Sequence, residues 1–254
     1  MMHLKAFLID SSPGKLVRAS TRHAHYALKE ASNGRKLRGV EKRLHLHLFS
    51  KGTFPSHALH GGQSRQGWGG IGGGRRRGRA VDAQVSRLVN ASSSSFSSLQ
   101  MRPTLKYAKN TFHALREMDL KPILAQRVLA QEELRLGTAC DLICLRGANE
   151  LVIVELKCGY AGDKNVAAHV GGESQYMQSP CSTALDTILN RHLAQVAATY
   201  FLFSSERDTV SRLNAMGIQK ISAVLLYIND KGSELHSLNK WWIRRGKRII
   251  VSLR

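Results

Sequence analysis

Two runs of strand-forming residues joined by a short turn constrain the fold of this chain more than any other feature. Residues 134–145 (LRLGTACDLICL) and 151–157 (LVIVELK) are rich in Val, Ile, Leu and Cys. The segment between them, RGANE, contains Gly and Asn, which favour turns. The pattern predicts two neighbouring antiparallel strands inside a sheet.

Both predicted strands carry charged residues among apolar ones. Asp141 lies in the first strand, and Glu155 and Lys157 lie in the second. Side chains alternate across a sheet, so Glu155 and Lys157 share one face, and antiparallel pairing allows Asp141 to lie beside Glu155. Two close carboxylates repel each other, and a divalent cation offsets this most readily. We therefore expect a divalent cation at this point, and Mg²⁺ suits such oxygen ligands well.

Lys157 has a chemical task in such a site. It can orient or help to deprotonate a bound water and stabilise negative charge on a phosphate, which fits phosphodiester hydrolysis. An acid-x-Lys tripeptide alone is not specific, because Asp119-Leu-Lys121 is another example in this chain. The alternative interpretation is a cross-strand ion pair at a sheet edge.

The rest of the chain beyond residue 78 alternates between helical and strand-like patterns. Apolar spacing predicts helices at 79–89, 105–118 after an N-cap at Thr104, 182–205 and 207–216, and strands at 123–130, 221–229 and 248–254, with a loop over 158–182. We expect an α/β (α+β) domain over 79–254, in which helices flank a central mixed β-sheet.

The N-terminal part differs in composition. Residues 1–100 hold 17 Lys and Arg against 4 Asp and Glu, and residues 1–60 show no sustained periodicity. We expect residues 1–60 to be a basic segment that is disordered or serves in targeting, followed by a Gly/Arg-rich linker over 61–78. The pI of about 10.4 favours a polyanionic partner, with nucleic acid first.

The two strands and one downstream helix resemble the PD-(D/E)XK nuclease superfamily, in its RecB-like and lambda-exonuclease-like branch. Gly137-Thr-Ala-Cys-Asp141 matches the GxxxD element of that branch, and Glu155-Leu-Lys157 matches its (D/E)xK element. Gln195 matches the Gln of the family's downstream helix. Thr199 holds the place of the family's Tyr, and Tyr200 lies one position later.

The resemblance covers about residues 75–254 and implies a restriction-endonuclease-like core with Mg²⁺ or Mn²⁺ in the site. It implies metal ligation by Asp141, Glu155 and the carbonyl of Leu156. Asp82 stands where the branch often has a His on an N-terminal helix, so a further oxygen ligand there is one reading and an exposed acid is the other. Glu132 and Glu133 precede the first strand in a predicted turn.

The resemblance also implies roles for the other site residues. Lys157 positions or activates the water, and Gln195 steadies the water or the scissile phosphate. Candidate nucleic-acid contacts are cationic or aromatic residues near these elements: Arg75, Arg76, Arg77, Tyr160, Lys164, Arg191, His192 and Tyr200.

The expected function is a metal-dependent nuclease acting on DNA, with an exonuclease in repair, recombination or replication as the leading reading. A structure-specific endonuclease or junction resolvase is the second reading, and a non-catalytic nucleic-acid-binding protein of the same fold is the third. RNA stays open as a substrate, as does the oligomeric state. No apolar run is long enough to span a membrane, and four Cys without a CxxC pair suit a reducing compartment, with mitochondrion, nucleus and virus-infected cell all open.

Overall fold

The structure of the chain is a computed structural model, and it describes residues 2–11, 16–20, 25–28, 36–55, 73–91, 102–131, 133–230 and 232–253. Its helices are α1 (Met2–Asp10), α2 (Val40–His47), α4 (Gly73–Ala91), α5 (Lys106–Glu117), α6 (Ile188–Ser205), α7 (Arg207–Ala215) and α8 (Lys240–Ser252). Its strands are β1 (Leu16–Ser20), β2 (His25–Leu28), β3 (Lys36–Gly39), β4 (Leu120–Gln131), β5 (Leu136–Arg146), β6 (Glu150–Cys158), β7 (His169–Val170), β8 (Glu173–Ser174), β9 (Lys220–Asn229) and β10 (Gly232–Ser237).

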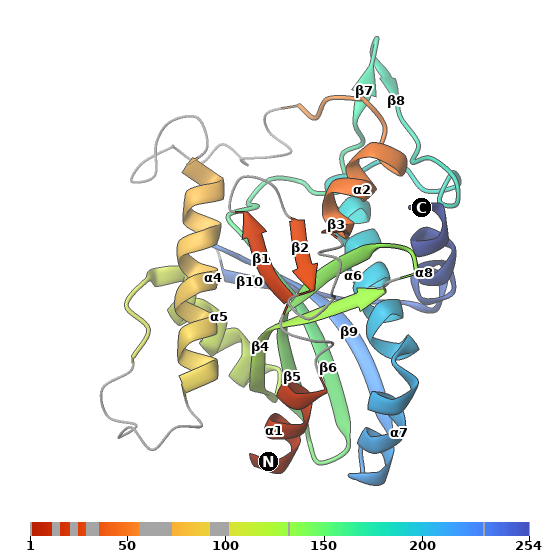
Figure 1. The fold of residues 1–254 in the computed structure, drawn as a ribbon. Coiled ribbons are helices and arrows are strands. Elements are labelled where there is room, and N and C mark those ends of the chain that lie inside the picture. The colour runs from red at the N-terminus through yellow and green to blue at the C-terminus, as the bar shows by residue number, and fades with distance from the viewer. Residues whose placement is uncertain are drawn as a thin grey trace.

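The main sheet is mixed. Its strand order is β1-β2-β3-β5-β6-β9-β10, and β4 also pairs with β5. The pairs β4/β5, β5/β6 and β9/β10 are antiparallel, whereas β6/β9 and β3/β5 are parallel. Figure 1 shows α4 and α5 on one side of this sheet and α6, α7 and α8 on the other. The expected α+β architecture, a central mixed sheet flanked by helices, is therefore confirmed.

Alternation along β6 divides its side chains between two hydrophobic cores. Leu151 and Ile153 pack with α6 on one face, while Val152 and Val154 pack with α4 and α5 on the other. Continuing the same alternation places Glu155 and Lys157 on the α6 face. The charged residues thus stand at the end of an otherwise apolar strand that is buried on both sides.

Strands β5 and β6 separate where their charged residues lie. Their pairing runs from Arg146 opposite Glu150 to Leu142 opposite Val154 and ends there. Beyond this point β5 continues against β4 and meets β3 at Gly137, while β6 continues against β9. The two strands form a fork, and Asp141 and Glu155 are the first residues past its branch point.

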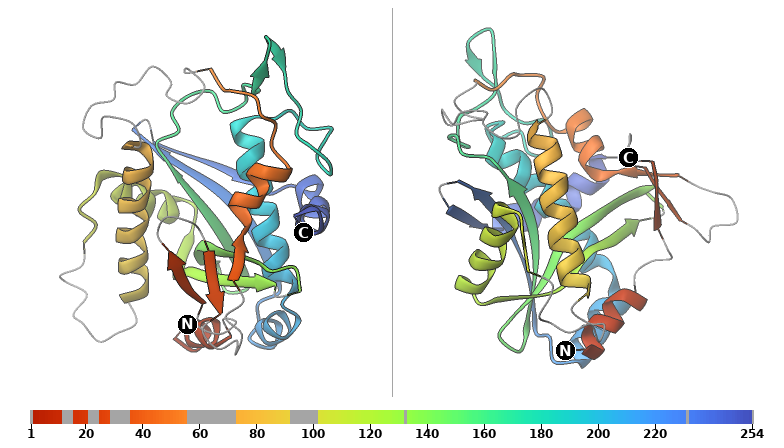
Figure 2. Two further views of the ribbon diagram at one scale, coloured as in Figure 1. Left: turned by 45° about the horizontal axis from the view of Figure 1, so that its top comes forward. Right: turned by 90° about the vertical axis from the view of Figure 1, so that its left-hand side faces the viewer.

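The expectation that residues 1–60 are disordered is wrong for the part of that segment which the structure describes. Leu8 on α1 and Leu44 on α2 are fully buried in the core on the α6 face. Figure 2 shows α2 beside the N-terminal end of α6. Each of these short helices buries only two apolar side chains, so the sequence shows no sustained period although the packing is helical.

The predicted linker is also partly wrong. Residues 73–78 form the first turns of α4, and residues 61–72 lie outside the described residues. Val81, Val85 and Val89 on the same helix are buried against the sheet, and this packing stabilises a helix whose Gly-rich start has low helix propensity.

The last predicted strand, 248–254, is a helix instead. Asn239 caps α8 by accepting a hydrogen bond from the backbone N–H of Trp242. Trp242, Ile249 and Ile250 are buried at helical spacing, which outweighs the β propensity of the Ile-Ile-Val run. The helix predicted from the N-cap Thr104 is confirmed as α5, although Leu105 occupies the cap position. The predicted loop 158–182 contains the short hairpin of β7 and β8, and strand β10 was not predicted.

Candidate active site

The carboxylate of Asp141 closes the fork between β5 and β6. Its Oδ2 accepts a hydrogen bond of 2.9 Å from the backbone N–H of Leu156. This N–H lies where β6 has left β5, so the side chain replaces the lost ladder partner. Asp141 therefore lies next to β6, as expected. It can reach Leu156 because the two strands have separated at this point.

Glu155, Lys157 and Gln195 form a closed hydrogen-bonded triangle. Lys157 Nζ lies 2.8 Å from Glu155 Oε1 and donates to Gln195 Oε1 at 3.1 Å. Gln195 Nε2 donates to the same Glu155 oxygen at 2.7 Å. Gln195 therefore uses both ends of its amide to fix the carboxylate and the ammonium group.

Gln126 links Asp141 to the carboxylate of Asp82 on α4. Gln126 Nε2 donates to Asp141 Oδ1 at 3.2 Å and to Asp82 Oδ1 at 2.9 Å. Gln126 lies on β4 opposite Asp141 and has a φ of 57°, a left-handed conformation that is uncommon for a residue with a side chain. Sequence reasoning placed Asp82 here only through the family resemblance, and it missed Gln126.

Burial raises the pKa of both strand carboxylates. The pKa of Glu155 is raised to about 8, first by burial and then by the negative charge of Asp141. Burial also raises the pKa of Asp141, against the opposing effects of Lys157, the Leu156 N–H and Gln126. Burial alone would lower the pKa of Lys157, but the charges of Glu155, Asp141 and Glu41 outweigh it and raise that pKa.

Glu41 at the start of α2 is a site residue that sequence reasoning missed. Its negative charge contributes to raising the pKa of Asp141 and of Glu155. It belongs to the segment expected to be disordered, and its sequence neighbours give no acidic pattern. The helical spacing of Val40 and Leu44 was the signal that could have revealed an ordered helix there.

The donor set suits a hard divalent cation. Within the described residues no group of three or more His, Cys, Asp or Glu side chains is arranged to hold a metal ion. Mg²⁺, however, is commonly bound through one or two carboxylates and keeps several waters. Asp141 and Glu155 supply two such carboxylates, whose pKa values are raised first of all by burial.

The predicted arginines lie on the first turns of α4. Arg76 is exposed, and the side chain of Arg75 lies outside the described residues. The guanidinium of Arg77 lies over the ring of Tyr107 and against Gly159, two residues after Lys157. Gly159 has a φ of 88°, a left-handed conformation that favours glycine, and Arg77 Nη2 occupies the space where a Cβ would lie. Arg77 is thus placed at the end of β6.

Tyr160 and His192 form an aromatic cluster with Tyr227, the residue of β9 that pairs with Lys157. The ring of His192 lies edge-on to Tyr160, and its Nδ1 lies 2.7 Å from the Tyr227 hydroxyl. Burial, followed by the charge of Lys157, lowers the pKa of His192 well below its ordinary value, so the imidazole is neutral at pH 7. Lys164 is buried and pairs with Glu234 at 2.7 Å, so its charge is already neutralised.

Arg191 and Tyr200 have structural partners away from the fork. Arg191 binds the buried carboxylate of Asp186 and is stacked between Phe49 and Phe54, which ties α6 to the end of α2. Tyr200 directs its hydroxyl toward the carbonyl of Ile221, near the start of β9. Lys157 of β6 lies beside the opposite end of β9. The structure does not bring these two predicted residues to the site.

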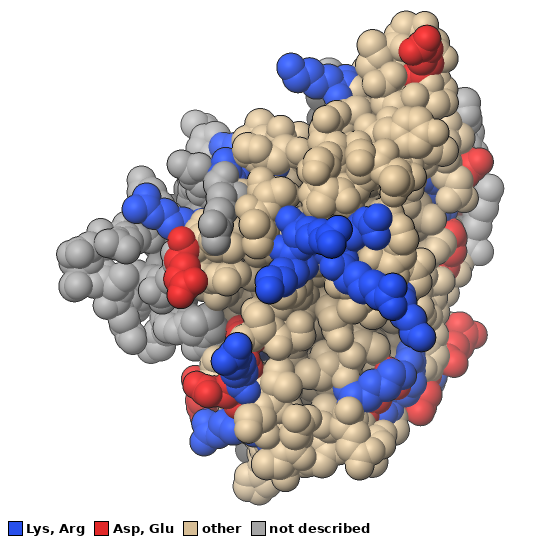
Figure 3. Space-filling view, turned by 90° about the vertical axis from the view of Figure 1, so that its right-hand side faces the viewer, with Lys and Arg blue, Asp and Glu red and all other residues tan. Residues whose placement is uncertain are grey.

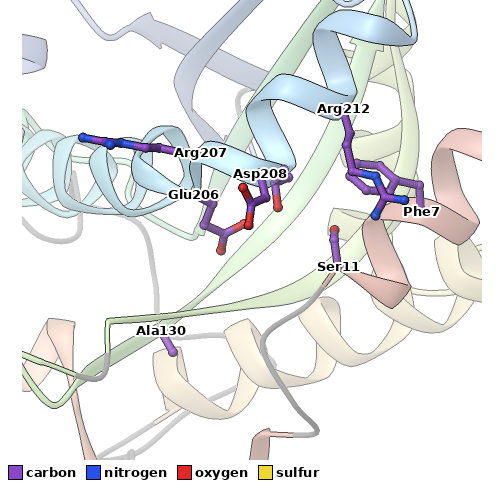
Figure 4. Close-up of a pocket in the computed structure, with 8 residues that line it drawn as sticks. Phe7, Ser11, Ala130, Glu206, Arg207, Asp208 and Arg212 are labelled. Atoms are coloured by element: carbon purple, nitrogen blue, oxygen red, sulfur yellow. The ribbon is translucent and has the colours of Figure 1, made fainter.

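A separate pocket lies between α1, β4 and α7 (Figure 4), and it is lined by Phe7, Ser11, Ala130, Glu206, Arg207, Asp208, Thr209 and Arg212. Glu206 is paired with Arg127 at 2.7 Å, and Arg212 lies over the ring of Phe7. Arg127 also donates to the carbonyl of Leu8. These contacts hold α1 on the body of the protein.

Comparison with protein-family models finds no matching family, and comparison with curated proteins finds no match. Among the described residues, no helix is both long and apolar enough to cross a membrane.

Proposed function

We propose that the chain is a metal-dependent nuclease that hydrolyses the phosphodiester bonds of DNA, with a site of the PD-(D/E)XK type. The observation that carries the proposal is the convergence of Asp141, Glu155, Lys157 and Gln195 at the fork of two buried strands. A purely structural ion pair would need one carboxylate and one ammonium group. Here two carboxylates with raised pKa values surround a single Lys, which is costly without a further cation.

The residues divide the chemistry between them. Asp141, Glu155 and the carbonyl of Leu156 would hold Mg²⁺ or Mn²⁺, which when bound polarises a phosphoryl oxygen and makes water more acidic. Lys157 has a raised pKa and stays protonated, so it acts as a hydrogen-bond donor that stabilises charge on the phosphate rather than as a base. Gln195 holds Lys157 and Glu155 in this orientation.

The test is a cleavage assay with and without Mg²⁺ or Mn²⁺ on linear duplex DNA, circular duplex DNA, single-stranded DNA and RNA. The parent protein is compared with Lys157→Ala and Asp141→Asn. Lys121→Ala is the matched control, because Lys121 ends the other acid-x-Lys tripeptide of the chain and is exposed at the start of β4. We expect cleavage that requires metal, is lost in both site variants and persists in the control.

Substrate preference then defines the type of nuclease. Degradation of linear but not circular DNA would identify an exonuclease, and cleavage of both would identify an endonuclease. Cleavage without metal, or full activity of both site variants, would refute the proposal.

A further inference from the structure

Helix α8 presents a row of cations on its outer face. Lys240, Arg244, Lys247 and Arg248 are all exposed, and α8 contains no Asp or Glu. Their spacing of four, three and one residues places them on one side of a helix, over a length of about 12 Å. We refer to these four residues as the basic stripe. Figure 3 shows Lys and Arg side chains gathered in the middle of the face that α8 belongs to, with acidic side chains toward its edges.

Nothing in the described part of the chain neutralises the basic stripe. None of its four residues lies within salt-bridge distance of an acid among the described residues, whereas Lys106, Arg127, Lys157, Lys164 and Lys220 all do. Four like charges on neighbouring turns repel one another, which costs stability in the free protein. A polyanion that lies along the helix would remove this cost.

We propose that the basic stripe binds the phosphate backbone of duplex DNA outside the active site. This inference rests on the proposed function, because it takes the substrate to be a nucleic acid. Phosphate contacts of this kind position a protein on DNA without reading its sequence. The stripe therefore serves to hold the substrate while the fork between β5 and β6 acts on it.

The surface favours a duplex over the other polyanions. The apolar side of α8, with Trp242 and Ile249, is buried against α6, so the helix has no wide apolar face to insert into a membrane. Trp241 is covered by the guanidinium of Arg245 at 3.5 Å from its ring centre, so it offers no open ring for stacking of unpaired bases.

The stripe is also connected to the site. Arg43 on α2 donates to the carbonyl of Leu253 at the end of α8, with a distance of 2.7 Å. Lys42, next to it on α2, is exposed, and Glu41 on the same helix acts on the charges at the fork. Helix α2 therefore contacts the end of α8 and also carries an acid whose charge acts on Asp141.

The experiment measures binding without cleavage. Arg244→Gln/Lys247→Gln/Arg248→Gln is compared with the parent on a fluorescent duplex of about 30 base pairs, in EDTA and at several salt concentrations. Lys109→Gln/Arg116→Gln/Lys121→Gln is the matched control. It removes three exposed cations from α5 and the start of β4, on the opposite side of the sheet, and changes the net charge equally.

We expect the stripe variant to bind at least ~10-fold more weakly near physiological salt, and its slope of log K against log salt to be smaller in magnitude by about 2–3. The control variant is expected to keep the parent slope. Equal losses in both variants, an unchanged slope in the stripe variant, or no binding by the parent would overturn the inference. The inference would also be overturned if the stripe variant lost the parent's binding to vesicles containing anionic phospholipid but kept its binding to DNA. That result would assign the stripe to membranes.

Two further measurements keep the outcome clear. Thermal melting shows whether the triple variant is folded; if it is not, the three single variants are used, and each is expected to reduce the slope by about 0.9. Cleavage is assayed separately. If the parent binds DNA through the stripe but never cuts it, the proposed nuclease activity is refuted and the proposed role of the stripe holds. If the parent cuts DNA and the stripe variant binds DNA as tightly as the parent, only the proposed role of the stripe is refuted.

Discussion

Asp141 Oδ2 accepts the backbone N–H of Leu156 at 2.9 Å, at the point where β5 and β6 part. The same carboxylate receives Gln126 on its other oxygen. Both oxygens are therefore oriented by donors, and the negative charge is fixed in place rather than free to turn.

Replacing this charge by an amide is expected to abolish activity while leaving the fold intact. Asp141→Asn keeps the acceptor for Leu156 N–H but removes the negative charge. We expect the single-turnover cleavage rate to fall at least ~100-fold, with a small change in melting temperature. A variant that cuts at the parent rate would show that Asp141 has only a structural role.

The hydrogen bonds of Gln195 predict an effect on rate and not on substrate binding. Gln195→Ala leaves Lys157 and Glu155 without their common partner. We expect the single-turnover rate at saturating DNA to fall by about 10- to 100-fold, while the DNA dissociation constant measured in EDTA stays unchanged. Weaker DNA binding with an unchanged rate would instead place Gln195 in contact with the substrate.

The raised pKa of Glu155 predicts a pH dependence of stability. Its ordinary pKa is 4.5, and in the folded protein it is about 8. Between these values the folded state keeps a proton that the unfolded state has released, so the free energy of unfolding falls as pH rises through this window and is level above it. In EDTA, the melting temperature of the parent should therefore fall from pH ~5 to pH ~8 relative to Glu155→Gln. Parallel melting curves for the two proteins would contradict the raised pKa.

The position of Glu41 predicts a contribution to metal affinity. Glu41→Gln removes a negative charge that acts on Asp141 and Glu155. We expect the half-saturating concentration of Mg²⁺ or Mn²⁺ for cleavage to rise several-fold. Glu133→Gln is the control, because Glu133 is an exposed acid in the turn before β5. If both variants need the same extra metal, the effect belongs to the net charge of the protein and not to this position.

Two glycines in helices predict opposite effects on stability. A Cβ on Gly246 of α8 would lie 2.6 Å from the carbonyl oxygen of Ala197 on α6, whereas a Cβ on Gly78 of α4 meets nothing within 4 Å. Gly246→Ala is expected to lower the free energy of unfolding by about 1–3 kcal/mol, and Gly78→Ala to raise it by about 0.5–1 kcal/mol. Denaturant titration of both variants checks the pair, and stabilisation by Gly246→Ala would show that α8 is not packed as described.

The sequence predicted the central hairpin and the side on which its charges lie, because both follow from local rules. The alternation of side chains along β6 and the turn chemistry before it place Glu155 and Lys157 on one face whatever the rest of the chain does. The long helix α6 was equally readable, and it brings Gln195 to the pair.

The remaining site residues could not be read in this way, because long-range packing brings them there. Glu41 belongs to a short helix whose burial depends on α6 and the sheet, and Gln126 reaches Asp141 through an unusual backbone conformation. The wrong prediction at 248–254 has the same origin, since Ile249 and Ile250 of a β-branched run lie on the buried side of a helix that packs against α6.

The burial of α1 and α2 bears on where this chain can be cut. Leu8 and Leu44 fill the same core as the sheet, and Arg127 on β4 holds the carbonyl of Leu8. A shortened protein that begins after the glycine-rich stretch would lack α1 and α2, so apolar side chains beside α6 would be exposed to water. It would also lack Glu41, whose charge acts on Asp141 and Glu155. The described parts of the basic N-terminal segment therefore belong to the folded core of the protein.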